Sequence, residues 1–181
     1  MRIALITTIL GIGLLSVLLA AQEPPGKKSP SITMSPLPLT PVTRGKANTV
    51  ELQFHVSSGF HVNSNEPSAE YLIPTALKLE PPTDIMIGGI TYPEGQEMSF
   101  AFAPNEKLSV YSGEFDVTVM VRPLASVLPS NYEIHGQLRY QACDNAACYP
   151  PKQLPVRFEV KVVKAPPAPH KNPAQSPHIH N

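Results

Sequence analysis

Cys143 and Cys148 are the two cysteines of the chain, and they are the residues best suited to chemistry. A strand-like run leads into Cys143, Asp144–Asn145 favours a turn, and Pro150–Pro151 stops further strand pairing after Cys148. Cross-strand neighbours in a hairpin lie about 4.5–5.5 Å apart, a separation that a disulfide spans. The spacing therefore predicts a disulfide at the end of a short β-hairpin, and its chemistry would be thiol–disulfide exchange.

The predicted bridge has two interpretations that the residues alone leave open. It closes a loop of about six residues, which stabilises a fold by roughly 2 kcal/mol, against nearly 5 kcal/mol for a loop of about a hundred residues. Such a bridge contributes little stability, and because it lies at a loop, another thiol can reach it easily. It is either a redox pair that carries electrons or a structural bridge in an exported binding protein.

The surroundings of the cysteines favour a passive carrier over a strong oxidant. Four residues separate Cys143 from Cys148, whereas a thioredoxin motif has two and sits at a helix N-terminus. No cation is adjacent in the sequence, and the charge of Asp144 would oppose a thiolate. We expect no cofactor beyond the redox-active disulfide. A third interpretation is a copper(I)-handling protein, in which Met98 or Met120 joins the cysteines as a soft ligand.

Histidines and net charge add little to these alternatives. His61 either adjusts the cysteine pair by hydrogen bonding or proton transfer, or is an ordinary strand histidine. His55 falls on the polar side of its strand and is expected to be solvated. The formal net charge is +0, which gives no electrostatic basis for binding nucleic acid. Three histidines close to the C-terminus are not expected to form a specific metal site: His170, His178 and His180.

The elements that must position the cysteines are expected to be strands. Polar and apolar residues alternate in several short runs, which indicates strands with one buried face. Short strands separated by turns predict an all-β fold, an immunoglobulin-like antiparallel β-sandwich. Residues 123–128 could at most form one turn of helix. The expected strands are 49–56, 114–121, 133–140 and 156–162, the expected turns include Ser58–Gly59, Gly88–Gly89 and Ser112–Gly113, and the expected core includes Phe54, Phe115, Leu138 and Phe158.

Composition divides the chain into four segments. Residues 1–21 have a basic start, an apolar run and a small-residue end, as a secretory signal peptide does, although residues 3–21 are also long enough to anchor in a membrane. Residues 22–41 are Pro-rich and predict an extended tether. Residues 42–164 form the predicted domain. Residues 165–181 form a Pro- and His-containing tail that we expect to be disordered. The domain is therefore expected in the periplasm or cell envelope of a bacterium.

The motif around the cysteines resembles the N-terminal periplasmic domain of the thiol:disulfide interchange protein DsbD. The similarity is carried by Tyr140–Cys143, followed four residues later by Cys148–Pro151. It extends upstream through 59–65, 70–74 and 92–95, and in all it covers about 40–163. The resemblance implies an immunoglobulin-like sandwich and an activity as a component of a protein-disulfide reductase.

The resemblance also implies partners and roles for individual residues. Cys143 and Cys148 would receive electrons from a thioredoxin-like or membrane-embedded thiol donor and pass them to oxidised periplasmic thiol proteins, including factors of cytochrome c biogenesis. Cys148 would be the attacking sulfur and Cys143 the resolving one. Full-length DsbD continues into membrane and thioredoxin domains, so we expect the donor here to be a separate protein. A loop at 99–105 would cap the disulfide, with Phe100 or Phe102 as the cap and His61, Asn63 and Tyr149 as neighbours.

Overall fold

The computed structural model describes residues 31–166, which form strands joined by turns and contain no helix. Three four-stranded sheets result: sheet A with the order β1-β3-β9-β6, sheet B with β2-β12-β10-β5, and sheet C with β11-β4-β8-β7. The strands are β1 (Ile32–Met34), β2 (Thr40–Thr43), β3 (Asn48–Val56), β4 (His61–Asn63), β5 (Ala76–Glu80), β6 (Ile85–Thr91), β7 (Gln96–Phe100), β8 (Ala103–Tyr111), β9 (Glu114–Pro123), β10 (Asn131–Tyr140), β11 (Ala142–Cys143) and β12 (Lys152–Val163).

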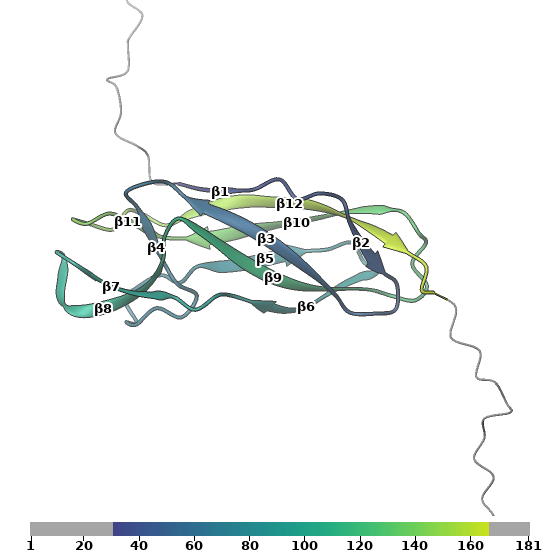
Figure 1. Ribbon diagram of the computed structural model, residues 1–181, viewed down its shortest axis with the longest axis horizontal. Coiled ribbons are helices and arrows are strands. Elements are labelled where there is room, and N and C mark those ends of the chain that lie inside the picture. Colours follow the sequence, from purple (N-terminus) through teal and green to yellow (C-terminus); the bar gives the residue numbers. More distant parts are fainter. Residues whose placement is uncertain (1–30, 167–181) are drawn as a thin grey trace, which may run out of the picture.

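Sheets A and B form the two layers of a β-sandwich (Figure 1). Their strands alternate buried and exposed residues, as in β3 and β9, because one face of each sheet packs on the core and the other meets water. The expected antiparallel sandwich and its strands are thus confirmed, with one parallel pair, β2 with β12. All the expected core residues are buried, namely Phe54, Phe115, Leu138 and Phe158.

The N-terminal boundary of the domain differs from the predicted one. The sequence predicts a tether that ends at residue 41, whereas β1 pairs with β3, and β2, which contains Pro41, lies along β12. Proline is tolerated in an edge strand, and an extended chain suits both a tether and a strand, so composition does not distinguish them. Residues 1–30 and 167–181, with the predicted signal and most of the tail, lie outside the described residues.

Two local expectations are also corrected. Gly88–Gly89, which suggests a turn, lies inside β6, where the pairing with β9 shifts register between Ile87 and Ile90. A bulge of this kind is a common use of glycine within a strand. The segment 123–128 contains a turn, closed by a hydrogen bond of 3.2 Å from the Val127 amide to the Leu124 carbonyl, and no helix.

Gly59 and Gly113 have positive φ angles of 86° and 66°, as turns at these positions require.

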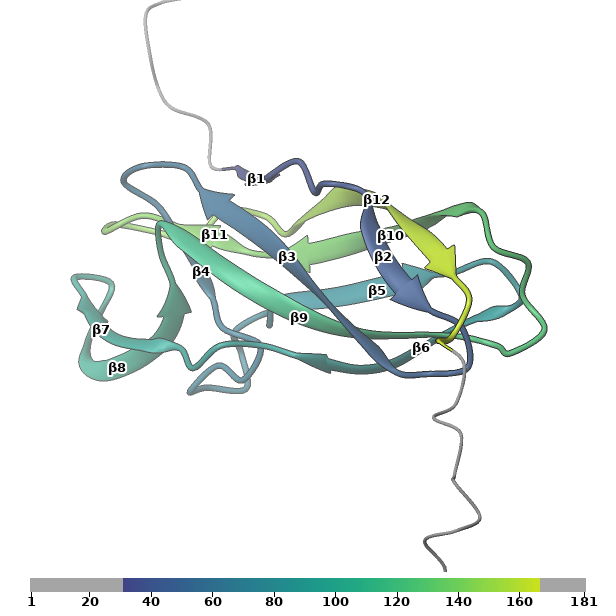
Figure 2. The same cartoon turned by 45° about the vertical axis from the view of Figure 1, so that its right-hand side comes forward.

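Sheet C lies at one end of the sandwich, beyond β3 and β9, and both views place β4, β7, β8 and β11 there (Figures 1 and 2). It has a small cluster of buried residues of its own, Leu72, Phe100, Leu108 and Val110, separate from the main core. This end of the molecule carries Cys143 on β11 and His61 on β4. Within residues 31–166 there is no helix of the length and apolar character needed to cross a membrane.

Candidate functional site

Cys143 and Cys148 form a disulfide at the tip of a hairpin, as the spacing predicts. Their Cα atoms lie 3.9 Å apart, and the two residues stand directly opposite each other as an antiparallel bridge. The flanking hydrogen bonds run from the Tyr149 amide to the Ala142 carbonyl and from the Asp144 amide to the Ala147 carbonyl, both 2.9 Å. The cysteines therefore occupy a non-hydrogen-bonded pair, the arrangement that brings opposite side chains closest.

The turn between the cysteines is organised by Asp144. One carboxylate oxygen accepts the backbone amides of Ala146 and Ala147 at 2.8 and 2.9 Å, and the other accepts the Tyr149 hydroxyl at 2.7 Å. The Tyr149 hydroxyl and then these amides lower the pKa of Asp144, so the carboxylate is charged at neutral pH. The same contact raises the pKa of Tyr149. A carboxylate held in place in this way directly follows Cys143 in the chain, and a negative charge near a thiol disfavours its thiolate.

The two sulfur-bearing residues differ in exposure. Cys143 is fully buried, at 0% exposed, whereas Cys148 is half-buried on the return side of the hairpin. Solvent therefore reaches part of Cys148 and none of Cys143. Thiol–disulfide exchange needs direct approach to one of the two sulfurs, and of the two cysteines Cys148 is the more exposed.

A network of hydrogen bonds connects β4 to the segment that follows Cys148. The Asn63 side chain is 0% exposed, and its amide nitrogen donates to the Ile73 carbonyl at 3.0 Å and to the Gln141 side-chain oxygen at 3.2 Å. Gln141 in turn donates to the Tyr149 carbonyl at 3.2 Å. Asn63, on β4, is therefore linked through Gln141 to the residue that follows Cys148.

Aromatic rings cover the other side of the site. The ring of Phe100 stacks on His61 with centroids 3.8 Å apart, and Phe102 stacks on Phe100 at 5.5 Å. The predicted loop at 99–105 is a tight hairpin, because β7 ends at Phe100 and β8 begins at Ala103. Phe100 is buried at 6% exposed, whereas Phe102 is half-buried. The tip of the β7–β8 hairpin thus covers His61, the residue opposite Cys143 in the pairing of β4 with β11.

His61 is the buried titratable side chain of the site. It is 4% exposed, and burial lowers the pKa of its imidazole from 6.5 to about 4, while the charge of Asp144 acts in the opposite direction. The imidazole is consequently neutral at pH 7. His55, by contrast, is exposed on β3, as expected.

The structure brings together most of the predicted site residues and adds some that sequence reasoning missed. Tyr149 packs edge-on against Phe60 at 5.8 Å between ring centroids. Phe60 and Gln141 were not singled out, although both lie within the segments that carry the family resemblance. The sequence assigns Asp144 to the turn and to a charge that opposes a thiolate, and the structure adds its contact with the Tyr149 hydroxyl.

Other polar groups do not build a second site. Met120 lies in sheet A, and Met98 lies on β7, at the opposite edge of sheet C from β11. Among residues 31–166, no group of three or more His, Cys, Asp and Glu side chains could hold a metal ion.

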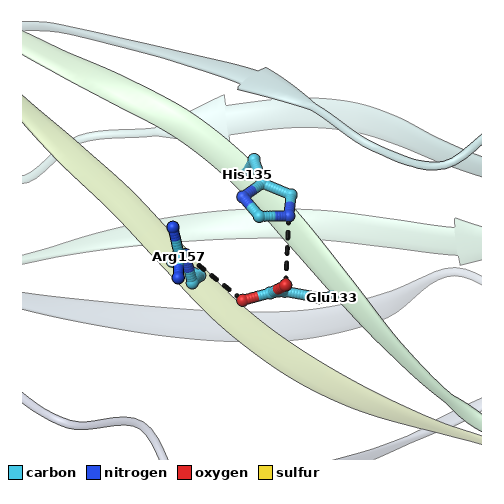
Figure 3. A network of polar contacts seen from close by, with 3 residues as sticks. All are labelled: Glu133, His135 and Arg157. Carbon is cyan, nitrogen blue, oxygen red and sulfur yellow. Dashed lines mark ion pairs between the residues drawn. The ribbon is translucent and has the colours of Figure 1, made fainter.

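Figure 3 shows Glu133 on β10 contacting His135 at 3.1 Å and Arg157 of β12 at 3.2 Å. These side chains are well exposed, and ion pairs of this kind contribute little energy.

Comparisons with known proteins point to one family. A family model described as the N-terminal domain of the thiol:disulfide interchange protein DsbD matches residues 34–159. No curated protein matches the chain. Among solved structures, the reduced DsbD N-terminal domain of Neisseria meningitidis is 21% identical, with a TM-score of 0.38, over 61% of this chain and 74% of that chain.

Two further solved structures match at low similarity. The complex between the DsbD N-terminal and PilB N-terminal domains of Neisseria meningitidis matches at 21% identity and a TM-score of 0.38, over 60% of this chain and 73% of that chain. A PapD-like domain of human CEP192 matches at 10% identity and a TM-score of 0.37, over 82% of this chain and 97% of that chain.

Proposed function

Because the chain belongs to the family of DsbD N-terminal domains, we propose that it is a thiol–disulfide carrier whose working groups are Cys143 and Cys148. The observation that carries this proposal is the difference in exposure, with a half-buried Cys148 bonded to a fully buried Cys143 at a hairpin tip. A bridge that ties residues so close in sequence adds little stability, yet one of its two cysteines is partly exposed.

The exchange follows from this asymmetry. A donor thiolate attacks Cys148, the bond between the cysteines breaks, and Cys143 leaves with the electron pair and takes up a proton. A second donor thiol then loses its proton and attacks the donor sulfur of the mixed disulfide, which releases Cys148. Two electrons and two protons pass to this chain, and the donor becomes a disulfide. The reverse sequence reduces an oxidised target protein, beginning with attack by Cys148.

The partners that fit this chemistry are proteins with paired thiols. We propose a thioredoxin-like or membrane-embedded donor and oxidised thiol proteins of the periplasm as acceptors. Family membership supports this choice, and so does the charge of Asp144, the residue that follows Cys143. That charge disfavours spontaneous thiolate formation, so the pair depends on a more reactive thiol in the partner.

A trapping experiment tests the proposal directly. The variant Cys143→Ser leaves Cys148 without its resolving partner, so it should accumulate mixed disulfides with donors or targets in isolated cell envelopes. The matched control is Cys148→Ser, which retains only the buried Cys143 and should trap far less. In parallel, a thioredoxin system with its reductase should reduce the wild-type protein. The proposal fails if the disulfide resists this donor and neither variant captures a protein.

A further inference from the structure

The hairpin that carries the cysteines is offset from the ladder of β10 and β12. That ladder is regular as far as Tyr140 opposite Lys152. Between this pair and the two cysteines, one arm has two residues, 141–142, and the other has three, 149–151, of which two are prolines. Proline has no backbone N–H and cannot donate to a ladder. The regular pairing of the sandwich therefore ends before the cysteines, and the tip of the hairpin depends on contacts of its own.

One such contact joins the two residues that follow the cysteines. Asp144 follows Cys143 and Tyr149 follows Cys148, and the Tyr149 hydroxyl donates to a carboxylate oxygen of Asp144 at 2.7 Å. The other carboxylate oxygen accepts two backbone amides of the turn between the cysteines. The Asp144–Tyr149 contact thus links the two arms one residue beyond each cysteine. It uses no atom of either cysteine, so opening the disulfide removes neither its donor nor its acceptor.

Both partners of this contact are held in place by other groups. The ring of Tyr149 packs edge-on against Phe60, with centroids 5.8 Å apart, and its carbonyl accepts the side-chain amide of Gln141 at 3.2 Å. The hydrogen bonds to Asp144, from Tyr149 first and then from the turn, lower the pKa of its carboxyl, which is therefore charged at neutral pH. Hydrogen bonds to an ionised acceptor are stronger than those between neutral groups.

We propose that Asp144 and Tyr149 are positioning residues, whose contact keeps Cys143 and Cys148 opposite each other while the disulfide is reduced. The inference rests on the proposed function and adds to it a second, non-covalent link across the hairpin. Two thiols held face to face form a disulfide more favourably than two thiols on separated arms, because less conformational freedom is lost when the bond closes. The contact therefore favours return of the reduced pair to the disulfide.

Equilibrium with glutathione measures this effect without a protein partner. The S–H bonds of Cys143 and Cys148 break and one S–S bond forms between their sulfurs. The S–S bond of oxidised glutathione breaks, and its two sulfurs take up the two protons and the two electrons that the protein gives up. The equilibrium constant for this exchange has units of concentration and reports the effective concentration of one protein thiol at the other. A loss of stability common to the oxidised and reduced forms does not change it.

The variant Tyr149→Phe keeps the ring against Phe60 and removes the hydroxyl. It should lower the equilibrium constant about fivefold, the effect of losing one hydrogen bond of average strength. The matched control Tyr71→Phe removes a similar hydrogen bond outside the hairpin, from the Tyr71 hydroxyl to the Glu106 carboxylate at 2.8 Å, and should match the wild type. In an Asp144→Ala background the contact no longer exists, so Tyr149→Phe should cause no further decrease there.

An unchanged or higher constant in Tyr149→Phe overturns the positioning role. The same decrease in both backgrounds also overturns it, because the hydroxyl would then act through a group other than Asp144. Either outcome leaves the carrier intact, since glutathione does not test partner recognition. Failure of the trapping experiment with Cys143→Ser would overturn the carrier while the glutathione result stands. A wild-type disulfide that glutathione cannot open would overturn both proposals.

Discussion

Burial of His61 should make the stability of the oxidised protein fall on mild acidification. The imidazole has a pKa of about 4 in the folded protein and of 6.5 when solvated. As the pH falls below 6.5, the unfolded chain binds a proton at His61 whereas the folded protein does not. The contribution of the neutral imidazole to the free energy of unfolding is therefore complete above this pH and is lost progressively down to about pH 4. At about 1.4 kcal/mol for each pKa unit, the loss attributable to His61 approaches about 3 kcal/mol.

Urea unfolding, followed by circular dichroism at several pH values between 7 and 4, measures this loss. His61→Phe should flatten the pH dependence by that amount, whereas His55→Phe should leave it unchanged. Asp144 does not cause the loss of stability in this pH range. Its pKa lies below the ordinary value of 3.8, so its contribution to the free energy of unfolding is lost only in more acidic solution. Identical pH dependence in the wild type and His61→Phe would refute the assignment of a buried, neutral imidazole.

Three further changes have defined outcomes. Phe100→Ala should return water to His61 and raise the pKa of the imidazole from about 4 toward 6.5, which a proton NMR titration would detect. Asn63→Ala removes the donor for two acceptors and should lower the free energy of unfolding in urea by about 2 kcal/mol. Replacing both Cys143 and Cys148 by alanine should cost about 2 kcal/mol and leave the circular dichroism spectrum unchanged. A much larger loss in the last experiment would identify the bridge as structural.

Local patterns in the sequence account for most of the fold. Alternation predicted β3, β9, β10 and β12 because each has one face on the core, and period two follows directly from that placement. The tether boundary was misplaced because β1 and β2 are short edge strands in Pro-rich sequence. Their pairing with β3 and β12 depends on partners far along the chain, which composition does not reveal.

The candidate site shows the same division between local and distant information. The facing cysteines were predictable, because the turn at Asp144 and the interruption at Pro150–Pro151 are both local signals. The family resemblance predicted His61 as a neighbour of the cysteines, but local signals could not place it directly opposite Cys143, since this requires β11 to pair with β4, which lies much earlier in the chain. The burial of His61 under the ring of Phe100 likewise depends on a residue from another strand, so only the three-dimensional structure reveals it.

The position of the hairpin explains how the bridge can open without loss of the fold. β10 and β12 pair continuously from Asn131 opposite Lys161 to Tyr140 opposite Lys152, and the cysteine hairpin extends from the end of this ladder. Both arms of the hairpin are therefore held by the sandwich, whose core lies between sheets A and B, whether or not the sulfurs are bonded. We therefore expect the arms to stay in register after reduction, so that Cys143 remains opposite Cys148 and can re-form the bridge. A carrier needs this reversibility, whereas a bridge that only stapled the fold would gain more from joining distant strands.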